Sequence, residues 1–180
     1  MPQQTPLQRL TRWLNIACLG LIIGLPLGSL LIWFQWESWG HVLAYRVGLA
    51  TERIPQSLTM TQTVLGIAVT LIPVGIMIFG LVRLRCLFLS FSRGAIFTTE
   101  NVRAIRVFAW CVVAIQIVKF LTEGLASMVI TMTNPPGQRA LVLQLSSDQV
   151  LWLFVGLIFV VIAHALEEGH RLADDSAAIV

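Results

Sequence analysis

Two oppositely charged residues interrupt a long apolar stretch of the chain. Lys119 and Glu123 are four residues apart, and Gln116 and Ser127 continue this spacing on either side. On a helical wheel the four positions fall within about 80°, so a helix would gather them into one polar stripe. Such a stripe could relay a proton or an ion, or hold a polar ligand between helices. We favour a simpler interpretation, a self-neutralising pair, because no second buried acid or base extends a pathway.

A second group of titratable residues follows the last apolar stretch. His164, Glu167, Glu168 and His170 lie within seven residues, and His164 and Glu168 would share a helix face. Their spacing is not the H-E-x-x-H zinc pattern, and charged residues are expected at a membrane boundary in any case. We therefore favour pairing with Arg171 or with the basic central loop over metal binding.

The remaining reactive residues do not form a recognisable site. Cys18, Cys86 and Cys111 have no paired or metal-binding spacing. We find no nucleophile with a neighbouring base, no phosphate-binding glycine loop and no set of metal ligands. We expect a protein that is not an enzyme and that uses no metal and no cofactor.

The elements that position these residues are membrane helices. The 180 residues are 57% hydrophobic and only 12% charged, with a mean hydropathy of +0.83, whereas about a quarter of the residues in a soluble domain are charged. Four segments are close to the roughly 20 apolar residues that a spanning helix needs: 13–36, 62–82, 107–130 and 150–166. We predict an all-α, four-transmembrane-helix bundle that forms a single membrane domain over residues 1–180.

The arginines predict the orientation of these spans. With the N-terminus inside, eight arginines are cytoplasmic, and three, Arg46, Arg53 and Arg139, are external; the eight are Arg9, Arg12, Arg83, Arg85, Arg93, Arg103, Arg106 and Arg171. This bias places both termini in the cytoplasm. It also accounts for the sequence pI near 9.1 without direct binding of nucleic acid.

Local signals define several helix ends. Thr98 is a candidate N-cap with Glu100 in the following turn, and Ser146 with Gln149 has the spacing of a capping box. The cluster at 134–137, Asn-Pro-Pro-Gly, should end the third helix and open an external loop. We expect the first external segment, about 37–61, to be partly ordered.

Glycines in the first span predict close helix packing. Gly20, Gly24 and Gly28 make two consecutive small-xxx-small steps on one face. This face could be the seam of a homodimer, but we favour packing within the bundle, because the other spans need a close neighbour.

The central loop, about 83–106, combines arginines with an apolar row. Leu84, Leu87, Phe88 and Phe91 have helical spacing, so the second helix should continue past the bilayer until Arg93-Gly94. The loop could be a docking groove for a partner helix. We favour contact with the membrane surface, with the arginines on anionic lipid.

Two short motifs carry a family resemblance. The stretch 94–106, GAIFTTENVRAIR, resembles the central signature of a bacterial membrane family, domain of unknown function 2975, at Gly94, Phe97, Asn101, Arg103 and Arg106. The C-terminal segment is similar in its acidic, glycine and leucine residues and its terminal aliphatic pair: Glu167, Glu168, Gly169, Leu172, Asp174, Asp175, Ile179 and Val180.

This resemblance implies an inner-membrane protein with four spans, no known enzymatic activity and frequent encoding beside a small helix-turn-helix regulator. It assigns no role to Lys119 or Glu123. We therefore expect a regulatory or interaction protein with a cytoplasmic transcriptional regulator as its partner. The alternative is a small permease or an ion or proton carrier that uses Gln116, Lys119 and Glu123.

Overall fold

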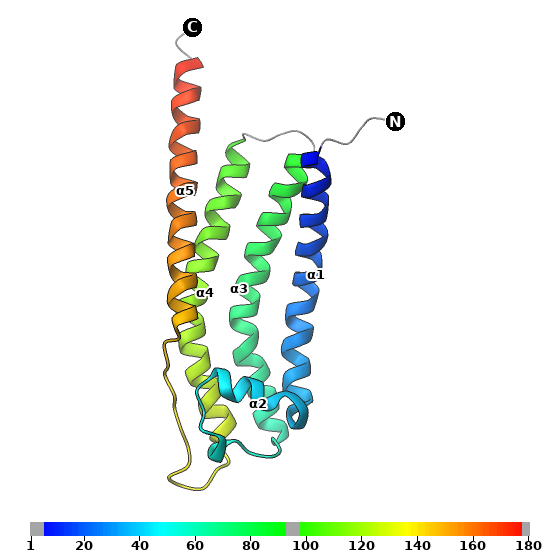
Figure 1. Ribbon diagram of the computed structural model, residues 1–180, viewed down its shortest axis with the longest axis vertical. Helices are drawn as coiled ribbons and strands as arrows, with labels where there is room; N and C mark the ends of the chain where they lie inside the picture. Colours follow the sequence, from blue (N-terminus) through cyan, green and yellow to red (C-terminus); the bar gives the residue numbers. More distant parts are fainter. Residues whose placement is uncertain (1–5, 93–97, 178–180) are drawn as a thin grey trace. The chain divides into compact units, whose positions relative to one another are not determined.

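The structure, a computed structural model, describes residues 6–92 and 98–177, and its regular secondary structure within these ranges is helical. The described residues form four long α-helices and one short one, which are labelled in Figure 1. In chain order they are α1 (Pro6–Phe34), α2 (Trp36–Arg46), a 3₁₀ turn η1 (Thr51–Arg53), α3 (Met60–Ser92), α4 (Thr99–Thr131) and α5 (Ser147–Ala177).

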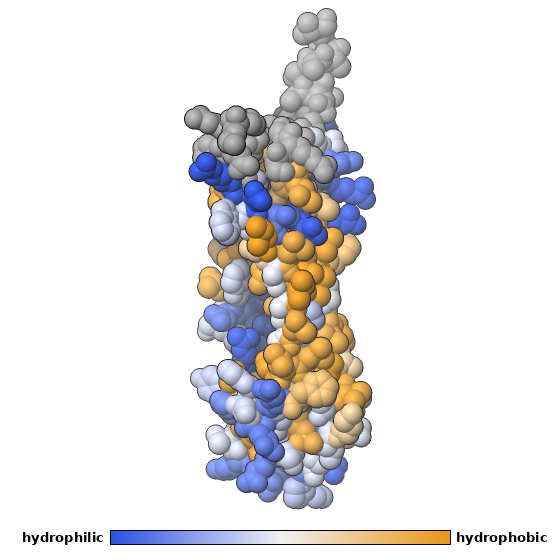
Figure 2. All heavy atoms as spheres, turned by 90° about the vertical axis from the view of Figure 1, so that its right-hand side faces the viewer, coloured by the Kyte–Doolittle hydropathy of each residue, from blue (hydrophilic) through white to orange (hydrophobic). Residues whose placement is uncertain are grey.

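The four predicted membrane spans are confirmed. The long helices contain stretches that are long and apolar enough to cross a membrane: Arg9–Phe34, Met60–Phe91, Thr99–Thr131 and Ser147–Gly169. Their outward side chains are largely apolar, as on the side viewed in Figure 2. Exposed leucines and phenylalanines suit contact with lipid tails, so the chain is a multi-pass membrane protein.

The predicted helix signals act as expected. The N–H of Asn101 donates to Oγ1 of Thr98 (3.2 Å), which caps α4. Ser146 and Gln149 form a reciprocal capping box, with both backbone-to-side-chain bonds at 3.2 Å. After α4, the chain turns through Gly137, whose φ of 93° is readily adopted only by glycine. The second helix does continue past its predicted span, to Ser92.

The segment between the first two spans, about 37–61, is partly helical, in agreement with the partial order that we predicted. It contains α2, which runs across the direction of the long helices (Figure 1). Trp36 anchors it by donating from Nε1 to the carbonyl of Pro55 (2.9 Å) and by stacking on Trp33, with ring centroids 5.8 Å apart.

Proximity of Cα atoms groups the chain into two compact units. Unit 1 comprises residues Met1–Ile22, Met77–Ala114 and Leu151–Val180, and unit 2 comprises Ile23–Ile76 and Ile115–Val150. The long helices contribute residues to both units. Whether the units form one domain stays a prediction.

Each unit has its own buried residues. Unit 2 is built around Trp33, Trp36, Ala44, Val47, Leu49, Ala126 and Ile130. In unit 1 the buried apolar residues include Leu81, Leu87, Ala109, Val112 and Ala163. Small residues let its helices approach: Gly80 lies against Cys111, and Gly156 lies against Val113.

The glycines of α1 do not pack as we favoured. A Cβ built on Gly20, Gly24 or Gly28 would meet nothing within 4 Å among the described residues. The residues through which α1 bonds to α3 are Asn15, Ser29 and Trp33, which lie on roughly the opposite side of the helical wheel. The close contact is instead at Gly66 of α3, which accepts the ring of Trp33. A homodimer seam at the α1 glycines stays a prediction.

Candidate functional site

Lys119 and Glu123 form the expected pair on α4. Nζ of Lys119 lies 3.6 Å from Oε1 of Glu123, and their side chains are 34% and 23% exposed. The i,i+4 spacing brings the two groups onto adjacent turns of one helix. Both charged groups are thus partly buried, and each neutralises the charge of the other.

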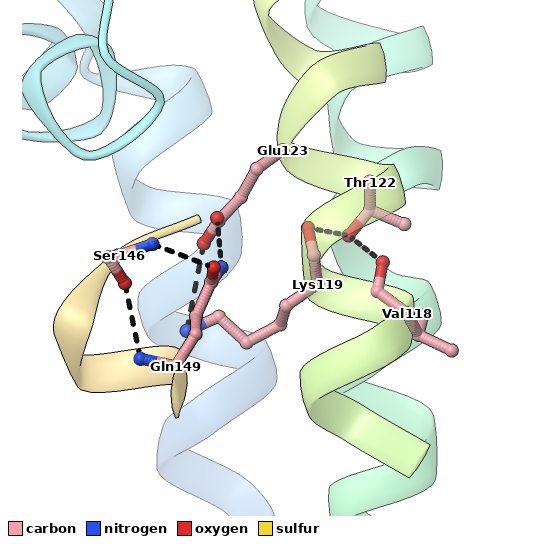
Figure 3. A network of polar contacts seen from close by, with 6 residues as sticks. All are labelled: Val118, Lys119, Thr122, Glu123, Ser146 and Gln149. Carbon is pink, nitrogen blue, oxygen red and sulfur yellow. Dashed lines mark hydrogen bonds and ion pairs between the residues drawn. The ribbon is translucent and has the colours of Figure 1, made fainter. Parts of the chain in front are cut away.

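Gln149 of α5 is the third member of this site (Figure 3). Its side-chain amide donates from Nε2 to Oε2 of Glu123 (2.5 Å). Its Oε1 accepts the N–H of Ser146 (3.2 Å) within the capping box. Gln149 is only 3% exposed, so the amide both closes the start of α5 and fixes the carboxylate of α4. We define Lys119, Glu123 and Gln149 as the charged clamp.

The chemistry available to the charged clamp is that of a compensated carboxylate. One oxygen of Glu123 faces an ammonium and the other accepts an amide hydrogen. The arrangement can hold the two helices together, and it offers a proton or cation exchange point if the pair separates.

The predicted polar stripe divides between two environments. Gln116 lies one turn before Lys119 and is half-buried. Ser127 is fully buried and turns to the segment after α4: its Oγ donates to the carbonyl of Gly124 (2.7 Å) and accepts the N–H of Val142 (2.8 Å). Ser127 therefore has a structural partner of its own and does not join the charged clamp.

A second glutamine clamp was not predicted from the sequence. Gln62, which is fully buried, accepts from the N–H and the hydroxyl of Thr59 through Oε1, both at 2.9 Å. Its Nε2 donates to the carbonyls of Val129 (3.1 Å) and Ile130 (2.9 Å) and to Oγ1 of Thr133 (3.1 Å). We define Thr59, Gln62 and these three acceptors on or just beyond α4 as the neutral clamp. Its sequence signal was the Thr-x-x-Gln spacing, equivalent to Ser146-x-x-Gln149.

An ion pair joins α4 to α5 within unit 1. One guanidinium nitrogen of Arg106, NH1, lies 2.7 Å from both carboxylate oxygens of Glu167, and the side chains are 41% and 43% exposed. His164 lies 3.9 Å from Glu167, and Arg171 lies 3.7 Å from Glu168. The contacts of Glu167 with Arg106 and of Glu168 with Arg171 are of the kind that we favoured over a metal site. Among the described residues, no group of three or more His, Cys, Asp or Glu could hold a metal ion.

The structure describes some residues of the family signature and not others. Asn101 is buried at the start of α4, Arg103 is exposed, and Gly169 is exposed on α5. Gly94 and Phe97 lie outside the described residues, as do Arg93, Ile179 and Val180. The side chains of His170, Leu172, Asp174 and Asp175 are likewise outside the description, although α5 includes these positions.

Unit 2 also has an open cleft of about 510 Å³. Trp33 and Trp36 line it, together with the polar residues Glu37, Ser38 and Thr63. None of the candidate site residues predicted from the sequence lines this cleft.

Comparison with known proteins gives one match. A family model described as "Protein of unknown function (DUF2975)" matches residues 35–180. No curated protein and no solved structure matches the chain. The matched region contains α2 to α5, and with them the charged clamp, the neutral clamp and the Arg106–Glu167 pair.

Proposed function

We propose, from the premise that this chain belongs to the DUF2975 family, that it is a regulatory membrane protein that acts by binding a cytoplasmic protein. In this proposal it resides in the inner membrane of a bacterium and has no enzymatic activity. The family membership agrees with the resemblance of the 94–106 stretch and the C-terminal segment, but its description assigns no role.

The observation that carries this proposal is the partly exposed charge on α4 and α5 of unit 1. The Arg106–Glu167 and Glu168–Arg171 pairs leave between 41% and 71% of each side chain exposed. Beyond Glu167, α5 continues for ten residues to Ala177, a length of about 15 Å. Exposed charges of both signs along α5 favour recognition of a protein by electrostatic complementarity.

In this proposal the charged surface of α4 and α5 faces the cytoplasm. The bias of eight arginines against three supports cytoplasmic termini. Labelling of single cysteines with a membrane-impermeant maleimide in intact cells tests it. Positions 52 and 138 should react from outside, and positions 103 and 171 should react only after lysis; the opposite pattern would place the charged surface outside.

Anionic lipid is the second partner in this proposal. Arg85 is already bonded through Nε to Oδ1 of Asn15 (2.9 Å). Arg83, which lies 5.2 Å from the ring centroid of Phe79, and Arg103 are exposed. Their guanidinium groups suit lipid phosphates at the inner surface. The apolar row beside them is not freely available to lipid, because Leu87 is buried within unit 1.

The test is binding of the partner class that the family resemblance implies. The protein in nanodiscs is titrated with a purified small helix-turn-helix regulator of the class that this resemblance implies. Reversing charge at Glu168→Arg with Arg171→Glu should weaken binding at least tenfold, whereas the matched reversal Glu52→Arg with Arg53→Glu in η1 should leave it unchanged. A wild-type protein that does not bind, or equal binding by both variants, would refute the proposal.

A second candidate function rests on the charged clamp. Lys119 is about one-third exposed, and Glu123 is held by an amide from another helix, which supports a small ion or proton carrier. In liposomes, Lys119→Ala and Glu123→Ala should each abolish a flux that the wild-type protein supports. A wild-type protein without flux for protons, monovalent cations and small polar solutes would eliminate this candidate.

A further inference from the structure

The start of α5 does not reach the end of α4. Gln149, the third residue of α5, bonds to Glu123, which lies eight residues before the last residue of α4, Thr131. Eight residues of helix are about 12 Å long. Over this length α4 is accompanied by the non-helical segment 140–146 (Figure 1). Thr131 contacts Ala140, Ser127 contacts Val142, and Gly124 lies against Leu143.

Three backbone groups of this segment bond to hydroxyl groups of α4. The N–H of Ala140 donates to Oγ1 of Thr131 (3.0 Å), and the Thr131 hydroxyl donates to the carbonyl of Ala140 (3.2 Å). The N–H of Val142 donates to Oγ of Ser127 (2.8 Å). Both hydroxyl residues are fully buried. Non-helical backbone is tolerated at membrane depth only when protein groups or a water-filled cavity satisfy it in this way.

The outer side of the segment is a row of exposed leucines. Leu141, Leu143 and Leu145 are 60%, 53% and 63% exposed. The alternate residues Ala140 and Val142 pack against the core of unit 2. A period of two separates the faces of an extended chain, so Ala140 and Val142 anchor one face to the protein while the three leucines are presented on the other. Gln144, which is also exposed, lies against Gly48 of unit 2.

Neighbouring helix turns indicate that this row lies at the depth of lipid tails. On α4, Leu125 and Met128 are 47% and 57% exposed, alongside the same segment. Gln62 sets α3 level with Val129 and Ile130, and the turn that follows Gln62 exposes Val64 and Leu65. The surface of unit 2 at this depth is therefore apolar on both helices.

We propose that residues 140–146 form a membrane-inserted, non-helical segment that completes the fourth span. Leu141, Leu143 and Leu145 contact lipid acyl chains, while Ser127 and Thr131 replace water for the backbone. The fourth crossing thus consists of an extended part followed by α5, and the charged clamp marks the point where the chain becomes helical.

Spin-label accessibility tests this proposal in proteoliposomes. Cys18, Cys86 and Cys111 are replaced by alanine, and one nitroxide is attached in turn at positions 141, 143 and 145. Position 138, in the exposed turn, is the aqueous reference, and position 157, exposed on α5, is the lipid reference. We expect collisions with oxygen to exceed those with a water-soluble nickel complex at all three positions, as at 157.

Two results would overturn the proposal. Nickel accessibility equal to that at position 138 would show that the segment faces water. Low accessibility to both reagents, with dipolar broadening between labels, would show that a second copy of the chain covers it. If the cysteine-free protein does not fold, the wild-type protein is labelled in liposomes with a membrane-partitioning carbene reagent. Labelling must then appear in peptide 140–146, and labelling only in α5 would again contradict the insertion.

Discussion

The neutral clamp and the charged clamp both use a glutamine that caps a helix start, but the two glutamines donate to different acceptors on α4. In each, a glutamine three residues after a Ser or Thr N-cap closes the cap with Oε1 and reaches α4 with Nε2. Gln62 reaches backbone carbonyls, whereas Gln149 reaches the carboxylate of Glu123. A backbone acceptor is present whatever the sequence, but a carboxylate depends on its own partners. We therefore expect the neutral clamp to be a fixed structural joint and the charged clamp to be adjustable.

The largest effect should come from Gln62→Leu. This change removes the cap and leaves the carbonyls of Val129 and Ile130 without their amide donor. We expect the free energy of unfolding to fall by about 3 kcal/mol. Unfolding in mixed micelles with increasing SDS measures it. Gln138→Leu, in the exposed turn, is the control, and equal losses for both variants would argue against the neutral clamp as a joint.

Glu123→Leu should have the next largest effect. It leaves Lys119 without its carboxylate in a partly buried position, which we expect to cost about 2 kcal/mol. Adding Lys119→Met to this variant should restore part of the loss, because the uncompensated charge is removed. The same unfolding assay applies. A double variant less stable than Glu123→Leu alone would show that the lysine contributes through packing and not through charge.

Gln149→Leu should destabilise the protein less than Gln62→Leu, by about 1.5 kcal/mol, since one cap and one side-chain bond are lost. A double-mutant cycle between Gln149→Leu and Glu123→Leu isolates the cross-helix bond. Its coupling energy should be clearly above zero. Additive effects would mean that the short Gln149–Glu123 contact contributes nothing to stability.

The smallest effect should come from Thr133→Val. Gln62 keeps its two carbonyl acceptors, so the loss should be about 0.5 kcal/mol. Thr61→Val, exposed on the first turn of α3, is the matched control. If the free energy of unfolding fell nearly as much as in Gln62→Leu, the Thr133 hydroxyl, and not the backbone carbonyls, would be the main acceptor of Gln62.

The sequence was sufficient for features that depend on neighbouring residues. The four spans follow from apolar length, and the Lys119–Glu123 pair follows from helical spacing. The Thr98 cap, the Ser146–Gln149 box and the break at 134–137 were also predicted. In each case the interacting groups lie within a few residues of one another, so their geometry is set by the helix itself.

The features that were missed depend on contacts between distant segments. In the sequence, Gln62 marks only the boundary of an apolar run. Its role could not be predicted because its carbonyl acceptors lie 67 and 68 residues away. Gly20, Gly24 and Gly28 had the correct pattern for close packing, but Asn15, Ser29 and Trp33 determine the face of α1 that meets α3. Ser127 shares a helix face with Glu123, but it bonds to Val142. Hydropathy did not predict the position of the segment that contains Val142.

The neutral clamp also has a consequence for the order of biosynthesis. A ribosome delivers α3 to the membrane before it has made residues 129–133, and N-terminal segments begin to fold first. During this interval the amide of Gln62 has its Thr59 cap but not its acceptors on α4. A nascent chain that stops before α4 is complete therefore exposes an unmatched polar group within its second span. The amide of Gln62 is satisfied only when α4 has been made and has packed beside α3.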